Sequence, residues 1–264
     1  MKGLRDINIG QHYPIDSLVH RLDARVKIAC AIAIIAGAFA ARRPEGVVLL
    51  SLFALGIIYL AKLPSLKVLA SLRAVWILLL ITGIAQLFFS PGRVLWEWGP
   101  FAITNTGLEN GVLYSLRLAM SVVLMSALTM TTNSLQMLAG LEGLMAPLRR
   151  VHFPVQETAM VLSMALRFLP VLLGRAGEIA AMQEARGADF SSRRLLSRAR
   201  SLLPLFIPLF TSCFQDAEEL GTALASRGYR GGGGRTRYRA QRFGLSDLAA
   251  LASTAAVIVL ALFV

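Results

Sequence analysis

Long runs of apolar residues, separated by arginine-rich stretches, are the feature that most restricts the fold of this 264-residue chain. Apolar residues make up 56% of the chain and charged residues 16%, whereas an average soluble domain carries about 25% charged residues. A helix needs about 20 apolar residues to cross the hydrocarbon core of a bilayer. The sequence therefore predicts an all-α membrane protein with about five transmembrane helices, at residues 26–41, 46–61, 74–89, 107–131 and 245–264.

The formal net charge is +12, and the basic residues concentrate in the first 27 positions and between Arg186 and Arg242. Basic segments can attract nucleic acid, but basic residues beside apolar spans are typical of cytoplasmic loops. No aromatic-rich or groove-reading motif accompanies the charge, so we expect no nucleic-acid partner. The pattern predicts a multi-pass protein of the cell inner (plasma) membrane with a cytoplasmic N-terminus, which places Arg42 and Arg43 outside, against the usual bias.

Reactive side chains are not grouped as an enzyme or a metal site would need. Cys30 and Cys213 lie far apart without a C-x-x-C motif, which argues against a disulfide framework or a zinc site. His12, His20 and His152 are dispersed outside the spans, and neither H-E-x-x-H nor G-x-S-x-G occurs, so we expect no catalytic, cofactor-binding or metal-binding residue. No cleavage pattern precedes the first apolar run, and we expect that run to direct insertion.

Three cations border or interrupt the predicted spans. Lys27 is the second residue of the first span and Arg42 follows its last residue. At these ends, long side chains can reach the membrane surface and lengthen a short apolar run. Arg117 falls in the fourth span, where an ionisable residue raises the question of function, but we expect it to lie near one end and to reach water in the same way. Residues 96–100 contain two tryptophans and predict an external loop, because tryptophan favours the membrane–water interface.

The character of the sequence changes at residue 133. We predict a four-span membrane domain at 1–132, a cytoplasmic or interfacial coupling domain at 133–230, a basic linker at 231–244 and a final span at 245–264. Spacings of three and four residues predict an amphipathic helix over 133–150, with apolar positions Leu135, Leu138, Leu141, Met145 and Leu148. Two long helices follow, at 155–186 with a kink at Pro170 and at 191–227 with kinks at Pro204 and Pro208. Their mixed composition predicts helices that graze the membrane and project into the cytoplasm.

Each long helix is expected to end in an arginine between small residues. These ends are Ala185-Arg186-Gly187 and Ser226-Arg227-Gly228, and 227 − 186 gives an offset of 41 positions. A cation at a helix C-terminus followed by glycine is an ordinary helix stop. Two matching stops on successive helices also suit a paired docking device, because a guanidinium offers a fork of donors to carboxylates or backbone carbonyls of a partner. Capping and docking are compatible, since a rigid helix end is a good anchor.

Several further short motifs follow one another along the chain. They are Gly10-Gln11-His12-Tyr13, Asp16-Ser17, His20-Arg21-Leu22-Asp23, Trp96-Glu97-Trp98-Gly99-Pro100-Phe101 and Ala165-Leu166-Arg167-Phe168-Leu169-Pro170. With the two arginine motifs, they resemble the transmembrane T component (EcfT, of the CbiQ/EcfT family) of energy-coupling factor (ECF) vitamin transporters, over nearly the whole chain. The chain is similar to the shared type that serves several S components. One departure is Ser226, where relatives often have alanine, and this small-for-small exchange leaves the docking inference intact.

The resemblance implies a coupling subunit that is not itself an enzyme. Two ABC-type ATPase subunits (EcfA and EcfA′) would bind ATP and magnesium and receive the motifs at Arg186 and Arg227. Their motion would pass through the long helices to an interchangeable S component, a membrane protein that binds the vitamin or other micronutrient. The implied S-component interface has six residues: Leu135, Leu138, Leu141, Met145, Met160 and Met164. The alternatives are a dedicated cobalt, nickel or biotin T subunit, or a permease that acts alone.

Methionines are frequent in the region from residue 120 to residue 182. Methionine usually fills cores, but its flexible side chain is also over-used at surfaces that accept several partners. We therefore hypothesise that Met137, Met145, Met160 and Met164 help one surface to accept different S components.

Overall fold

A computed structural model describes residues 17–91, 94–98, 101–151, 153–188, 195–229, 231 and 243–264. The opening motif at residues 10–13, Asp16, His152, the expected start of a helix at 191 and most of the linker at 231–244 lie outside the described residues. The described chain divides into two units. We call residues 17–144 and 243–264 the membrane unit, because they contain the five predicted spans, and residues 145–231 the α7–α8 unit.

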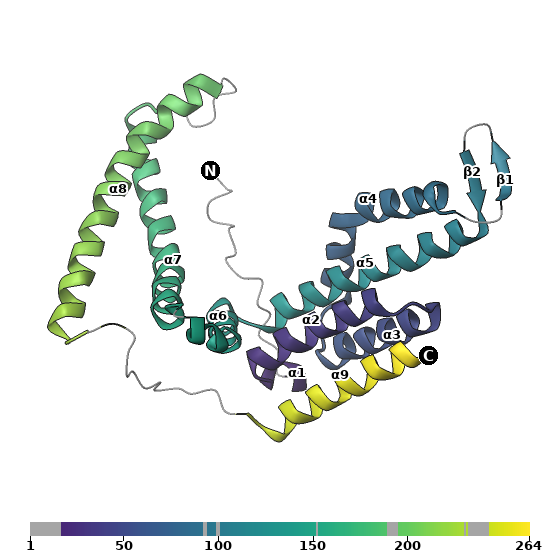
Figure 1. Ribbon diagram of the computed structural model, residues 1–264. Coiled ribbons are helices and arrows are strands. Elements are labelled where there is room, and N and C mark those ends of the chain that lie inside the picture. The colour runs from purple at the N-terminus through teal and green to yellow at the C-terminus, as the bar shows by residue number, and fades with distance from the viewer. Residues whose placement is uncertain are drawn as a thin grey trace. The chain divides into compact units, whose positions relative to one another are not determined.

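The membrane unit is built from helices with one small hairpin (Figure 1). Its elements are α1 (Leu18–Arg21), α2 (Ala24–Ala40), α3 (Pro44–Leu60), α4 (Ser65–Phe89), β1 (Val94–Trp98), β2 (Phe101–Thr104), α5 (Asn105–Thr131), α6 (Ser134–Leu144) and α9 (Leu245–Phe263). The α7–α8 unit contains a 3₁₀ helix, η1 (Ala146–Val151), followed by α7 (Val155–Ala185) and α8 (Leu195–Ser226). The predicted fold class, an all-α membrane protein, is confirmed.

Four of the described helices are long and apolar enough to cross a membrane, namely Leu66–Phe88, Asn105–Thr131, Val155–Ala185 and Leu245–Phe263. Helix α3 is apolar but has 17 residues, which corresponds to a length of about 26 Å. Helix α2 also has 17 residues. All five predicted spans are therefore helical, and α7, which we predicted as a coupling helix, is also apolar enough to span by length and composition.

Local signals explain where the helices of the membrane unit begin. Asp23 caps α2 by accepting a hydrogen bond from the backbone N–H of Arg25, and Thr104 caps α5 by accepting one from Gly107. Pro44 occupies the first turn of α3, where a missing N–H costs nothing. Asp247, in the first turn of α9, accepts hydrogen bonds from the backbone N–H groups of Gly244 and Asp23, each at 2.9 Å. This carboxylate therefore both caps α9 and links it to the start of α2.

The core of the membrane unit lies between α2, α3, α5 and α9. Its largest buried cluster contains Ile34, Ala38, Leu50, Ala54, Met120, Leu124 and Ala261. Glycine permits close backbone contacts at its edges: a Cβ at Gly46 would lie 2.2 Å from the carbonyl oxygen of Ala261, and one at Gly111 would lie 3.0 Å from that of Gly83. Small residues at helix interfaces are the usual means of packing membrane helices.

Two of the three cations that we expected to reach the membrane surface are buried instead. Lys27 is 7% exposed, and its ammonium donates to the carbonyls of His20 and Thr131, both at 3.1 Å. Arg117 is also 7% exposed; it donates to the carbonyl of Ala41 at 2.6 Å, and its guanidinium lies 5.0 Å from the ring centroid of Tyr114. For these two residues the prediction is wrong, because carbonyls at helix ends, which lack a partner within the helix, accept their hydrogen bonds. Arg42 is exposed.

Of the predicted external loop at residues 96–100, residues 96–98 lie in the first strand of an antiparallel hairpin. Strands β1 and β2 pair with Trp96 opposite Ile103 and Trp98 opposite Phe101. The hairpin connects α4 to α5, which pack along one another (Figure 1). Pairing of the two strands satisfies the backbone hydrogen-bonding groups of the segment. The loop prediction was based on the two tryptophans and did not consider this backbone requirement.

Candidate functional site

The first predicted motif forms the end of α7. Arg186 is the C-cap residue, and Gly187 follows in the left-handed region with φ = +92°. The backbone N–H of Gly187 donates to the carbonyl of Glu184 at 3.0 Å, and that of Ala188 donates to Gln183 at 2.9 Å. These two bonds define a Schellman motif, in which glycine avoids the steric cost that a side chain would incur.

The second motif closes α8 with the same geometry. Gly228 has φ = +70°, its N–H donates to Ala225 at 3.0 Å, and the N–H of Tyr229 donates to Leu224 at 3.0 Å. Arg227 therefore occupies the same place in this Schellman motif as Arg186 does in the first. The capping interpretation is consistent with both ends, and it fixes the backbone from which each guanidinium extends.

The six motif residues are exposed, and they are Ala185, Arg186, Gly187, Ser226, Arg227 and Gly228. A Cβ added at Gly187 or Gly228 would meet no atom within 4 Å. Each arginine thus stands on a rigid helix end with open space around the adjacent glycine. The two sites can accept a partner's surface close to the backbone.

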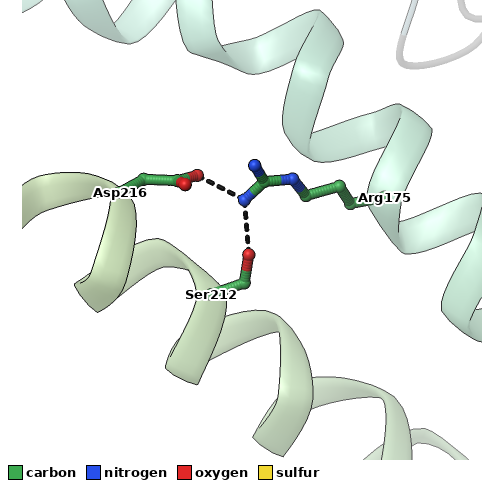
Figure 2. Close-up of polar contacts among 3 residues, drawn as sticks. All are labelled: Arg175, Ser212 and Asp216. Atoms are coloured by element: carbon green, nitrogen blue, oxygen red, sulfur yellow. Dashed lines mark hydrogen bonds and ion pairs between the residues drawn. The ribbon is translucent and has the colours of Figure 1, made fainter. Parts of the chain in front are cut away.

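An ion pair joins the two helices that carry the motifs (Figure 2). The guanidinium of Arg175, on α7, donates to the carboxylate of Asp216 and to the hydroxyl of Ser212, both on α8. The pair is partly buried, since 37% of the Arg175 side chain and 20% of the Asp216 side chain remain exposed. Sequence reasoning did not single out these residues, although 216 − 175 gives the same offset of 41 that separates the two motifs.

The ion pair lies at the same distance along the chain from both motifs. In α7, 186 − 175 gives 11 residues, and in α8, 227 − 216 also gives 11. Eleven residues make about three helical turns and return to the same face of the helix, and they extend about 16 Å along the axis. Because α7 and α8 run in opposite directions (Figure 1), the two arginines lie on opposite sides of the contact, roughly 30 Å apart if each helix continues straight.

The apolar residues predicted to bind a partner fall in both units. In α6, Gly140 and Gly143 lie against Ala24 and Arg25, and Met137 packs on a buried cluster of the membrane unit. Of the predicted set, Leu135 is 51% and Leu141 45% exposed, and Leu138 is half-buried. At 100° per residue, these three leucines lie on the side of α6 away from the two glycines. Met137 is therefore in part a packing residue.

In the α7–α8 unit, the remaining predicted residues are Met145, before η1, and Met160 and Met164, one turn apart on α7; all three are half-buried. Sequence reasoning missed a stripe of phenylalanines on α8, Phe206, Phe210 and Phe214, whose exposed fractions are 46%, 59% and 73%. The rings of Phe206 and Phe210 are 6.5 Å apart. Their spacing of four residues is visible in the sequence and could have identified them.

Among the described residues, no group of three or more histidine, cysteine, aspartate or glutamate side chains could hold a metal ion. The polar contact between α7 and α8 consists of one cation, Arg175, and two acceptors, Ser212 and Asp216. Such a contact orients helices.

Helices of this length and composition define a multi-pass, membrane-embedded helical protein. The sequence profile of the family CbiQ, described as "Cobalt transport protein", matches residues 16–238. A protein of Acidaminococcus fermentans named "Energy-coupling factor transporter transmembrane protein EcfT" is 39% identical over 262 residues, which cover 99% of this chain and 96% of the relative. Proteins with the same name from Thermosediminibacter oceani and Bacillus subtilis are 40% and 37% identical, covering 95% and 88% of each chain.

The chain therefore belongs to the CbiQ/EcfT family of ECF transporter transmembrane proteins. The resemblance predicted from the sequence motifs is confirmed. Members of this family are components of transporters, so this chain is a transport subunit.

Proposed function

We propose that this chain is the coupling subunit of an ECF-type ABC importer. It transmits the ATP-driven motion of two cytoplasmic ATPase subunits to a substrate-binding S component, for uptake of a vitamin or another micronutrient. The observation that carries the proposal is the pair of matching, exposed arginine ends at Arg186 and Arg227, placed symmetrically about one interhelical ion pair.

The spacing of the two ends favours two separate binding sites. A globular domain of about 200 residues has a radius of gyration of about 16 Å, so two such domains in contact have centres about 40 Å apart. Two arginines roughly 30 Å apart suit a pocket on each of two adjacent subunits better than one shared pocket. Each guanidinium would donate to carboxylates or carbonyls of its own ATPase subunit.

The exposed apolar faces suit the S component. Leu135 and Leu141 on α6 and the phenylalanine stripe on α8 are exposed, and Leu138 is half-buried. Contiguous exposed apolar patches often mark interaction sites. We assign these faces to interchangeable S components, with Met145, Met160 and Met164 as adaptable contacts. ATP and magnesium would be bound by the ATPase subunits alone.

The proposed location is the cell inner (plasma) membrane. The N-terminus and the region from 133 to 230 would face the cytoplasm, because arginine concentrates there and cytoplasmic loops are enriched in basic residues. This orientation places Arg186 and Arg227 on the side where ATP is available.

A dedicated cobalt-transport subunit is the second candidate. The description of the matching family names cobalt, whereas the relatives that cover nearly the whole chain carry the general ECF name. Identifying the membrane proteins that co-purify with this chain separates the two candidates. Several different S components would support the shared type, and one cobalt-binding partner would support the dedicated type.

The test of coupling is a double substitution, Arg186→Ala with Arg227→Ala, in the full complex. We expect ATPase subunits to be lost from a mild-detergent purification and ATP-driven uptake to stop, while the S component stays bound. The matched control, Arg42→Ala with Arg73→Ala, removes two exposed arginines of the membrane unit and should leave both readouts unchanged. Normal ATPase recovery and uptake in the motif variant would contradict the proposal.

A further inference from the structure

A groove of about 950 Å³ opens between α1, the end of α3 and the beginning of α4. All of its lining residues belong to the membrane unit. Most of the lining is apolar, with Leu55, Ile58, Val68 and Leu69 among the walls. Two cations, Arg21 and Lys62, also line it. The groove is therefore amphipathic, with a long apolar part and a basic part.

The apolar walls continue onto side chains that face outward. Tyr59 is 85% exposed, Leu18 72% and Leu69 62%. In a membrane-spanning unit such side chains contact acyl chains, and tyrosine favours the level of the headgroups. The groove thus opens on a surface whose natural neighbour is lipid.

The basic part lies at the level expected for lipid headgroups. Lys62 follows α3 by two residues, and α3, at about 26 Å, is slightly shorter than the hydrocarbon core of about 30 Å. We expect the end of α3 to lie near the membrane surface, because the charged group of Lys62 favours the headgroup level over the hydrocarbon core. Arg21 and Lys62 are exposed, and neither forms an ion pair with a carboxylate among the residues that the structure describes. Two cations that line one groove, with no acidic partner among the described residues, suit an anionic ligand.

We propose that this groove binds one anionic phospholipid. The phosphate lies between Arg21 and Lys62, and an acyl chain follows the wall formed by Leu55, Val68 and Leu69. Charge complementarity selects this occupant, because basic pockets between membrane helices bind anionic headgroups, whereas an apolar partner helix gains nothing from two unpaired cations. The bound lipid fills the space between α3 and α4 and fixes their separation.

The test measures lipid retention by the full-length chain in its complex. Nanodiscs with equal amounts of phosphatidylglycerol and phosphatidylcholine are dissolved in mild detergent, and retained lipid is counted by native mass spectrometry. We expect one retained phosphatidylglycerol. In a titration, Arg21→Gln with Lys62→Gln should weaken its binding about thirtyfold, from the typical contribution of two basic residues at a membrane surface. The control Arg42→Gln with Arg73→Gln removes the same charge outside the groove and should bind normally.

A second variant tests the apolar part with both cations intact. Leu69→Trp fills the groove and should displace the lipid without changing the charge. Equal retention of phosphatidylglycerol and phosphatidylcholine would overturn the proposal, as would equal losses in the groove and control variants. It would also fail if adding an S component, rather than lipid, protected Lys62 from chemical labelling, since a protein would then occupy the groove.

Discussion

The contact between Arg175 and Asp216 allows the sharpest test of how the two motifs are held. We consider Arg175→Ala, Asp216→Ala, the double variant, and the exchange of Arg175→Asp with Asp216→Arg. If the contact sets the crossing of α7 and α8, its loss lets the helices swivel. Each motif lies about 16 Å from the contact, so a swivel of about 15° displaces each arginine by about 4 Å. That displacement exceeds the length of a hydrogen bond, about 3 Å.

The energy of the contact follows from its exposure. A hydrogen bond to a charged group contributes about 1.5–3 kcal/mol when protected from water. Because 37% of the Arg175 side chain and 20% of the Asp216 side chain are exposed, solvent screening lowers this to about 1–1.5 kcal/mol. If docking depends on the crossing, each single substitution should weaken ATPase binding by about five- to twelvefold.

The assay is binding of the purified ATPase pair to the chain in nanodiscs. The double variant should bind no worse than either single variant, and the exchanged pair should recover most of the affinity. Glu219→Ala, which removes an exposed carboxylate of α8, is the control and should bind normally. Additive single effects, with a coupling energy below about 0.3 kcal/mol, would refute the idea that this pair sets the geometry.

Two further predictions concern glycines. Gly187→Ala and Gly228→Ala meet no steric obstacle, so their destabilisation of about 1–2 kcal/mol comes only from the left-handed backbone. Faster hydrogen exchange in the last turn of each helix should reveal this destabilisation. Unchanged protection from exchange would contradict the prediction. Gly46→Ala brings a Cβ to 2.2 Å from a backbone oxygen and should destabilise the membrane unit by about 1–3 kcal/mol. Gly56→Ala, with nothing within 4 Å, is its control; equal melting temperatures for both would contradict the packing argument.

The spans were predictable because hydrophobic length is a local property of the sequence. Four of the five predicted runs begin within two residues of the observed helix start. The exception is α4, which begins at Ser65 rather than at residue 74. Lys67 and Arg73 excluded its first part from an apolar run, although a charged residue does not interrupt a helix. Apolar runs in a sequence predict which segments cross the membrane, whereas capping residues predict where the helices begin and end.

The candidate site was predictable only where its signal was local. Arg186-Gly187 and Arg227-Gly228 carry a helix stop within a few residues, and both stops form as expected. The partnership of Arg175 with Asp216 depends on how two helices cross, which no periodicity within one helix reveals. The burial of Arg117 likewise follows from its position beside the end of another helix.

The two units are stabilised by different kinds of contact, and this difference bears on coupling. Among the described residues, buried apolar side chains are numerous in the membrane unit, whereas Val155 and Ala180 are the ones found in the α7–α8 unit. A unit without a substantial core cannot fix its own geometry by packing. The crossing of α7 and α8 therefore depends on the ion pair and on whatever covers the phenylalanine stripe. If a partner supplies that covering surface, as proposed, a displacement of the arginine ends would change the fit of the partner, and a mechanical linkage requires this property.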